Sequence, residues 1–301
     1  MQGYFVYDDR QSVPGVQTYS PSAGKPARFM ERLRDWSYRV WRHNQLPMQP
    51  VTKEDLYLVH DRAYVDGVFD GSISNGFGNF DPRVPEACLW TVGSLTSAVL
   101  QAPSLSLPVC SPTSGFHHAG YDFGEGFCTF NGLMVAAAKY LAVNPGHKVG
   151  ILDCDFHYGN GTADILKQLP ELASRVVHHT SGQFFHDRDD DPLDFFQWLH
   201  HSIEDINAQG CNVTIYQAGA DMHKDDPLGG ILDDIEMSKR DRMVFGQLRG
   251  AIAWNLAGGY RQTDSQDVLD DPVLETHIRT VAEVNRTSGL RAELNTPVHY
   301  A

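Results

Sequence analysis

The stretch that most constrains the fold is residues 148–162, which read KVGILDCDFHYGNGT. It opens as an apolar run of strand character and closes in a Gly- and Asn-rich turn. Within it, Asp153, Asp155 and His157 occupy every second position. Because alternate side chains of a β-strand share a face, a strand ending near Cys154 would point all three toward one side as the chain leaves the sheet.

An aspartate and a histidine two residues apart can supply half of a site for a divalent metal. A simpler interpretation is that one aspartate caps a helix starting near Gly161 and that His157 is an ordinary surface residue. The motif alone does not decide between these interpretations, so further ligands have to come from other parts of the chain.

Segments of helical and strand character alternate along the sequence. Apolar residues at helical spacing predict helices over 27–43, 85–101, 132–143, 194–208, 238–248 and 270–286, with a short helix after 162. Apolar runs predict strands over 106–111, 148–154, 174–178, 213–218 and 251–257. The alternation predicts an α/β fold with a parallel central sheet and helices on both faces.

We find no internal repeat and no Pro/Ser-rich linker, so we interpret residues 1–301 as one domain. Residues 71–85, GSISNGFGNFDPRVP, predict a long loop, which in a compact domain is more often functional than idle.

Composition excludes several classes of protein. The net charge of −14 disfavours a nucleic-acid partner and weakly favours cationic ligands. No window approaches 18 apolar residues and the start has no signal-peptide pattern, so we expect a cytoplasmic protein without a membrane partner. Five scattered cysteines without a CxxC pair predict reduced, buried thiols: Cys88, Cys110, Cys128, Cys154 and Cys211.

Polar residues follow four of the predicted strands. In open parallel sheets, ligands bind where the carboxyl ends of the strands lie along one edge. We therefore expect the following side chains to converge there: His117, His118, Asp153, Asp155, His157, Asp221 and Tyr260. Two aspartates and a histidine, Asp155, His157 and Asp221, would leave one coordination position open, as in catalytic zinc sites. Zinc in such a site lowers the pKa of bound water to about 7 and polarises a carbonyl group.

The tandem pair His117–His118 lies in a Gly-rich loop and could supply a general base and a general acid. Asp153 and Asn160 flank the metal pair and are candidates for orienting the imidazole rings. Tyr260 follows two glycines at a strand end, where its hydroxyl could donate to an oxyanion. Taken alone, it would more simply be a core tyrosine.

Five segments resemble, in order and spacing, the motifs of the zinc-dependent histone deacetylase family, which includes bacterial acetylpolyamine amidohydrolases. They are GFHHA (115–119), GFCTFNG (126–132), LDCDFHYGNGT (152–162), QAGADMHKDDPLGG (217–230) and AGGY (257–260). The resemblance covers residues 51–261. It implies an arginase/deacetylase-like fold and amide hydrolysis with one catalytic Zn²⁺.

The resemblance also implies a role for each polar residue of the predicted site. The zinc ligands are Asp155, His157 and Asp221. His118 is the general base and acid, with Asn160 as its partner. His117, paired with Asp153, has a more electrostatic role, and Tyr260 stabilises the oxyanion. Asn160, where many class I members carry Asp, is similar to the class II and bacterial branch.

Further residues are assigned by the same resemblance to a substrate channel. Phe127 and Phe185 wall a channel for an aliphatic chain, and the carbonyl of Gly126 meets the scissile amide. A potassium ion, held largely by backbone carbonyls near the Asp-x-Asp-x-His strand, is also implied.

Three positions depart from the family pattern. Tyr158 replaces the usual second histidine, giving HYGNGT. The loop before the tandem histidines reads SPTSGF instead of RPPG, which predicts altered rim contacts. The segment after Tyr260 is short, which leaves C-terminal packing and the formation of a homo-oligomer open. An arginase-like dimetal site is disfavoured, because its DxHxD pattern reads DxHxxN here.

Three functions compete. The first is removal of acetyl or similar acyl groups from lysine side chains of a protein or peptide. The second is hydrolysis of an acetylated small amine by an acetylpolyamine amidohydrolase. Leu228 in DPLG, where a polyamine-selective branch has Glu, favours acyl-lysine, whereas the net charge and the acidic loop 189–191 favour the polyamine. The third, a non-catalytic protein that binds acyl ligands, is disfavoured by the intact ligand set.

Overall fold

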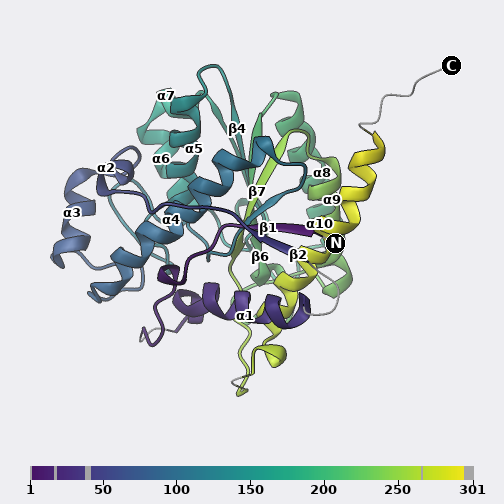
Figure 1. Cartoon of the computed structure of the whole chain (residues 1–301), viewed down its shortest axis with the longest axis horizontal. Coiled ribbons are helices and arrows are strands. Elements are labelled where there is room, and N and C mark those ends of the chain that lie inside the picture. Colours follow the sequence, from purple (N-terminus) through teal and green to yellow (C-terminus); the bar gives the residue numbers. More distant parts are fainter. Residues whose placement is uncertain (1, 17–18, 38–41, 266, 295–301) are drawn as a thin grey trace.

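The structure is a computed structural model that describes residues 2–16, 19–37, 42–265 and 267–294 (Figure 1). Within these residues, one parallel sheet has the strand order β2-β1-β3-β7-β6-β4-β5. The strands are β1 (Gln2–Phe5), β2 (Arg42–Gln45), β3 (Val109–Ser111), β4 (Val149–Asp153), β5 (Val176–Thr180), β6 (Val213–Gly219) and β7 (Ala251–Ala257). The predicted α/β fold with a parallel sheet is confirmed. The assignment of residues 1–301 to one domain stays a prediction.

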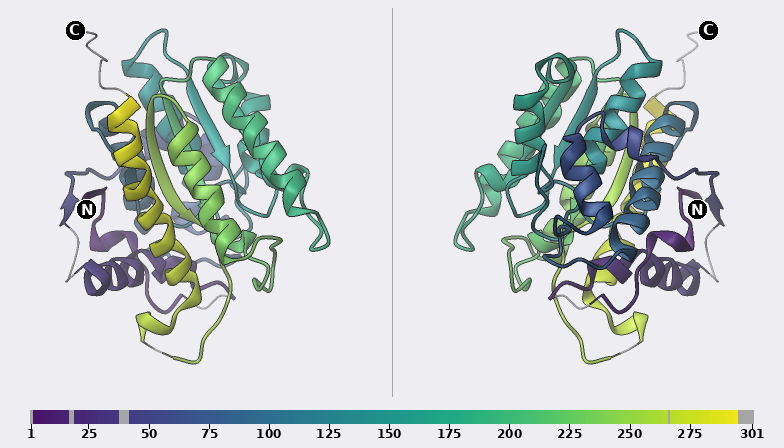
Figure 2. Two further views of the ribbon diagram at one scale, coloured as in Figure 1. Left: turned by 90° about the vertical axis from the view of Figure 1, so that its right-hand side faces the viewer. Right: turned by 90° about the vertical axis from the view of Figure 1, so that its left-hand side faces the viewer.

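Helices cover both faces of this sheet (Figure 2). On one face lie α1 (Lys25–Ser37), α8 (Pro192–Ala208), α9 (Asp234–Gln247) and α10 (Pro272–Leu294). On the other lie α4 (Arg83–Gln101), α5 (Gly132–Val143) and α6 (Asn160–Gln168). The shorter helices are α2 (Lys53–Leu56), α3 (Arg62–Asp70), α7 (Pro170–Ala173) and the 3-10 turn η5 (Ala220–Met222).

The central strands are apolar on both sides because both sides are covered. In β4, Ile151 belongs to the core cluster that includes residues of α4 and α5, whereas the next residue, Leu152, belongs to the cluster that includes residues of α8 and α9. Ile215 and Tyr216 of β6 divide between the two faces in the same way. This continuous apolar character explains why β4, β6 and β7 were predictable from the sequence.

The N-terminal part of the prediction is confirmed only in part. The helix predicted over 27–43 ends at Ser37 in the described residues, and Arg42 and His43 belong to β2 instead. Residues 38–41, with the predicted helix positions Val40 and Trp41, lie outside the described residues. Strands β1 and β2 were missed. The reason is that β2, with the sequence RHNQ, pairs through its backbone with β1 alone and carries no apolar pattern.

Other boundaries differ by a few residues. The strand predicted over 106–111 begins only at Val109, and the strand predicted over 174–178 is shifted to Val176–Thr180. Helix α9 starts at Asp234, four residues before the predicted start, because Asp233 and Glu236 form a capping box there. Residues 71–82 contain no helix or strand, in agreement with the predicted loop.

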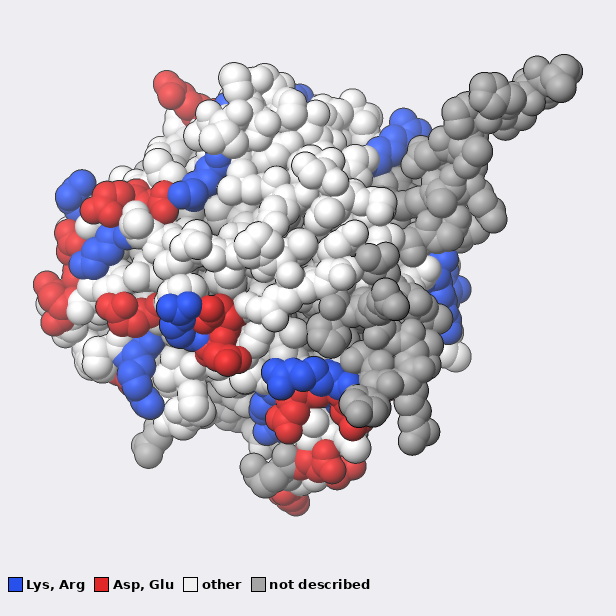
Figure 3. All heavy atoms as spheres, in the orientation of Figure 1, with Lys and Arg blue, Asp and Glu red and all other residues white. Residues whose placement is uncertain are grey.

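All five cysteines are free, and four are buried, as predicted. Among the helices of the described ranges, none has the length and apolar character required to cross a bilayer. On the face shown in Figure 3, acidic and basic side chains are interspersed toward the left and the lower edge, and the middle is largely uncharged.

Candidate active site

The Asp-x-Asp-x-His segment leaves β4 through two consecutive turns that its own aspartates stabilise. The strand ends at Asp153, one residue earlier than expected. The Asp155 N–H donates to Asp153 Oδ1 at 3.1 Å, and the His157 N–H donates to Asp155 Oδ1 at 3.0 Å. These side chain–backbone bonds are a common use of aspartate in turns. They carry Asp155 and His157 out of the sheet toward the end of β6.

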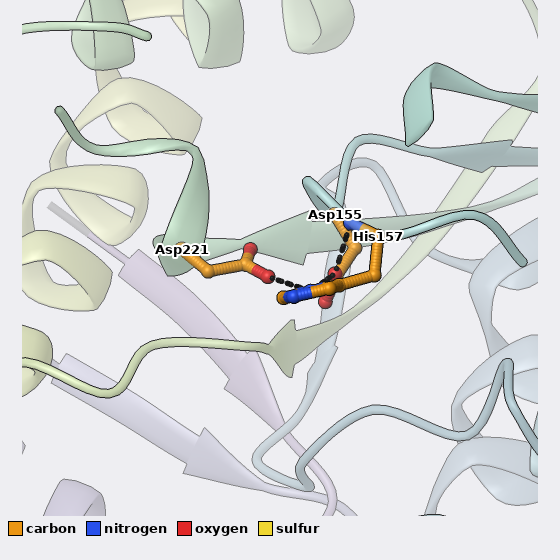
Figure 4. Close-up of side chains that lie close together, drawn as sticks. All are labelled: Asp155, His157 and Asp221. Carbon is orange, nitrogen blue, oxygen red and sulfur yellow. Dashed lines mark hydrogen bonds and ion pairs between the residues drawn. The ribbon is translucent and has the colours of Figure 1, made fainter. Parts of the chain in front are cut away.

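Asp155, His157 and Asp221 meet at the carboxyl edge of the sheet (Figure 4). His157 Nδ1 lies 3.1 Å from Asp155 Oδ1 and 2.9 Å from Asp221 Oδ2. Asp221 sits in η5, directly after β6, and its Oδ1 accepts the Phe156 N–H at 3.3 Å. One ligand atom from each residue lies within 4.8 Å of the others. Two carboxylates and one imidazole are a donor set that zinc accepts, so these residues fit the expected metal.

The same three residues bring two carboxyl groups and an imidazole close together, with both carboxyl groups buried. Burial alone would lower the pKa of His157, but its hydrogen bonds to Asp155 and Asp221 raise that pKa to about 11. Burial and the neighbouring Asp155 charge raise the pKa of Asp221 to about 8. Metal binding releases protons from ligands of this kind. A divalent cation would replace the shared protons and neutralise both carboxylates.

His117 is buried and belongs to a hydrogen-bonded chain behind the cluster. Its Nδ1 lies 2.7 Å from Asp153 Oδ2, and its Nε2 lies 3.7 Å from Asp155 Oδ1. Gln217 of β6 donates from Nε2 to Asp153 Oδ1 at 2.9 Å, so the carboxylate is bound on both sides. Burial opposes protonation of His117, but the charges of Asp153 and Asp155 outweigh it and raise its pKa to about 9. This ring is suited to an electrostatic role.

His118 lies beside His117, with 4.0 Å between the ring centroids, yet its surroundings have the opposite effect. Burial and the positive charge of His117 lower its pKa to about 4. Its Nδ1 lies 2.6 Å from Oδ1 of Asn160, the first residue of α6. The expected pairing is therefore present, and the surroundings shift the pKa values of His117 and His118 in opposite directions. Two titratable groups with diverging pKa values suit separate roles in catalysis.

Tyr260 lies across the site from the histidines. Its ring centroid is 6.2 Å from that of His157 and 5.8 Å from that of Phe127. Its N–H donates to Asp226 Oδ2 at 2.6 Å, and this hydrogen bond fixes the start of the loop that follows β7. Burial, followed by the charges of Asp155 and Asp221, raises the pKa of Tyr260, so its hydroxyl keeps its proton. Gly258 is required nearby, because a Cβ there would lie 2.3 Å from Asp221 Cγ.

Gly126 and Phe127 form a strained turn against His118. Both have positive φ angles, 54° and 67°, and Phe127 is the one non-glycine residue with a positive φ in the described ranges. A Cβ on Gly126 would lie 2.3 Å from His118 Cδ2, so glycine is needed for this approach. The Phe127 N–H donates to the carbonyl of Gly76, and its ring lies 5.9 Å from that of Phe77. Strain of this kind is concentrated at functional sites.

Two of the predicted channel residues lie apart from these groups. Phe185 is buried, and its ring contacts those of Phe195 and Trp198 on α8. Leu228 is 38% exposed in the loop after η5. Neither lines the cavity at the metal cluster, so their roles as channel residues stay predictions.

A small cavity adjoins the cluster and is lined in part by Asp155, His117, Phe127 and Tyr260. Its lining includes Lys25, a residue that the sequence analysis missed. Lys25 is buried at the start of α1, and its Nζ donates to the carbonyl of Gly258. Burial lowers its pKa to about 8. No sequence motif marks this lysine, because the carbonyl group that it binds, that of Gly258, is 233 positions away in the chain.

The divergent loop SPTSGF lies inside the molecule. Ser114 and Gly115 line both the catalytic cavity and an adjoining, mainly apolar cavity. Phe116 of the same loop is buried and also lines the second cavity. The departure from the family pattern therefore affects the base of the site. Tyr158, the other substituted position, is 40% exposed.

This parallel sheet, with polar residues gathered at its carboxyl edge, has the architecture of the arginase/deacetylase fold. Residues 22–196, more than half of the chain, match the histone deacetylase domain. The chain belongs to this family.

The chain is similar to known proteins in both sequence and structure. The chain is 26% identical to acetylpolyamine amidohydrolase 2 of Pseudomonas aeruginosa over 266 residues, which is 77% of this chain and 74% of that protein. In structure it is similar to the HDA15 HD domain, with a TM-score of 0.72, 20% identity and coverage of 95% and 89%. It is also similar to an acetylpolyamine aminohydrolase from Burkholderia pseudomallei, with a TM-score of 0.65, 15% identity and coverage of 94% and 98%.

Proposed function

We propose that this protein is a zinc-dependent amidohydrolase that removes acetyl or similar acyl groups from lysine side chains. The observation that carries the proposal is the Asp155–His157–Asp221 cluster, with the His117–Asp153 and His118–Asn160 pairs beside it. Zinc held by these three residues would activate a water molecule and polarise the acyl carbonyl.

The side chains around the cluster have complementary tasks in this proposal. His118 takes a proton from the attacking water at Nε2 and later delivers it to the leaving amine nitrogen, as the amide C–N bond breaks and a C–O bond forms. Protonated His117, held by Asp153, adds positive charge next to the reacting carbonyl. The Tyr260 hydroxyl donates to the carbonyl oxygen as negative charge develops there.

The remaining predicted residues belong to the same proposal. Phe127 walls the channel for the aliphatic chain, with Phe185 further out, and the Gly126 carbonyl accepts from the scissile amide. A potassium ion near the Asp153–Asp155 turn is also proposed. Backbone carbonyls would hold it there, where the Asp155 carbonyl now accepts from Ser181 Oγ at 2.6 Å.

A zinc determination combined with an acetyl-lysine assay tests the function. We expect about one zinc per chain and hydrolysis of a fluorogenic acetyl-lysine peptide, both lost on treatment with a chelator. Asp221→Ala should lose both. Zinc binding without hydrolysis of any acylated amine would show that the protein is a non-catalytic binder.

Hydrolysis of acetylpolyamines is a second candidate, favoured by one observation at the site. Glu125, directly before Gly126, presents an exposed carboxylate next to Asn160, and such a group could bind the free ammonium of a polyamine. The acidic loop contributes less, since Asp190 and Asp191 accept hydrogen bonds from nearby backbone N–H groups. The Pseudomonas and Burkholderia relatives bear acetylpolyamine names.

A comparison of substrates separates the two candidates. We expect a higher kcat/KM for an acetyl-lysine peptide than for N-acetylputrescine. Leu228→Glu should shift this ratio toward the polyamine, and the control Ile235→Glu, the same change at an exposed position of α9, should not. A preference of wild type for N-acetylputrescine of about tenfold or more, worth about 1.4 kcal/mol, would favour the second candidate.

A further inference from the structure

The side chain of Glu125 is linked to His118, the proposed general base, through the side chain of Asn160. It lies in the loop between His118 and α5, and its side chain is exposed. Its Oε1 accepts a hydrogen bond from Asn160 Nδ2 at 2.7 Å. Asn160 in turn places Oδ1 2.6 Å from His118 Nδ1. The three side chains form a continuous row from the exposed end of the site to the imidazole.

The carboxylate determines which way round the amide of Asn160 lies. An ionised glutamate can only accept hydrogen bonds, whereas an asparagine side chain donates from Nδ2 and accepts at Oδ1. The end of Asn160 that faces Glu125 must therefore be Nδ2. In the described part of the chain, the side chain of Asn160 makes no other hydrogen bond. Its orientation consequently depends on Glu125.

The orientation of Asn160 then decides where the proton of His118 lies. An amide oxygen 2.6 Å from Nδ1 requires that Nδ1 carries hydrogen. In a neutral imidazole, Nε2 then has the free lone pair that a general base needs. With the amide reversed, Nδ2 would donate to Nδ1 and the proton would move to Nε2. That tautomer cannot accept a proton from water at Nε2.

We propose that Glu125 is a positioning residue of this enzyme, which orients the amide of Asn160 and thereby keeps the proton of His118 on Nδ1. The inference rests on the proposed function, because it assigns a purpose to His118 Nε2. It adds to the His118–Asn160 pair a third residue, which neither the Asp-x-Asp-x-His motif nor the tandem histidines indicate. Glu125 acts through Asn160 and does not touch the reacting atoms.

Steady-state kinetics of three variants provide the first test. Glu125→Ala should lower kcat for an acetyl-lysine peptide by about tenfold or more, because loss of a partner that orients a site residue commonly costs 10- to 100-fold, while KM stays within about twofold. Glu125→Gln keeps an acceptor oxygen toward Asn160 and should retain most of kcat. The control Asp122→Ala removes the same charge from an exposed position of the same loop and should leave kcat unchanged.

Nitrogen-15 NMR of the histidine rings tests the inference without any substrate. His118 is assigned by comparison with His118→Gln, and its two ring nitrogens report the tautomer directly. In zinc-loaded wild type we expect hydrogen on Nδ1, and in Glu125→Ala a substantial population with hydrogen on Nε2. An unchanged tautomer in Glu125→Ala, or equal loss of kcat in the alanine and glutamine variants, overturns the proposal. An inactive wild-type enzyme would contradict the proposed function instead, and the tautomer would still be measurable.

Discussion

His60 is a buried histidine that the structure holds in its neutral form, and we expect it to make the stability of the protein depend on pH. It is 2% exposed. Its Nδ1 donates to the carbonyl of Gly120 at 2.7 Å, and its Nε2 accepts the Asn131 N–H at 2.9 Å. Gly120 and Asn131 bound the loop that carries Gly126 and Phe127. A second proton on His60 would have to sit on Nε2, where it would face the Asn131 N–H.

The size of the effect follows from the pKa of this group. Burial lowers the pKa of His60 from 6.5 to about 4 in the folded protein. Between these values the unfolded chain binds a proton that the folded protein does not, so the free energy of unfolding falls as the pH falls. The slope is about 1.4 kcal/mol per pH unit, and the total loss between pH 6.5 and pH 4 is about 3 kcal/mol. The slope falls to half near pH 6.5, and above about pH 7.5 His60 contributes almost no pH dependence.

Urea unfolding of the zinc-free protein at about pH 7, 6 and 5 measures this slope. The matched variant is His60→Asn, which cannot titrate and in which we expect the side-chain amide to keep a donor toward Gly120. It should be less stable at pH 7 by about 1–3 kcal/mol, because the Asn131 N–H loses its acceptor. This difference should shrink by about 1.4 kcal/mol for each pH unit below 6.5. Parallel stability curves over this range would refute the reasoning.

Three further predictions concern the catalytic groups. Asp155→Ala or Asp221→Ala should abolish hydrolysis and lower zinc occupancy while circular dichroism stays unchanged; full activity in either variant would contradict the ligand assignment. Tyr260→Phe should lower kcat by about 100- to 1,000-fold with little change in the binding of a substrate analogue, and an unaltered kcat would exclude its role at the oxyanion. His118→Ala should reduce kcat at least as much as His117→Ala in the same peptide assay, and the reverse order would exchange their roles.

Much of this protein could be determined from its sequence because its buried strands carry a local pattern. Strands β4, β6 and β7 are covered on both faces, so apolar runs mark them directly. Asp155, His157 and Asp221 follow two of these strands, and parallel strands necessarily bring their carboxyl ends to one edge. The pairing of His118 with Asn160 also agrees with what the family resemblance implied.

Other features depend on contacts between distant segments and leave no local pattern. The edge strand β2 is recognised only through its backbone pairing with β1, because its side chains are polar. Lys25 reaches Gly258 across 233 positions. Glu125 binds Asn160, which is 35 positions away, and no sequence pattern distinguishes it from other exposed glutamates in loops. Sequence periodicity reports whether a side chain is buried, whereas the partner of a polar group is decided only when the chain has folded.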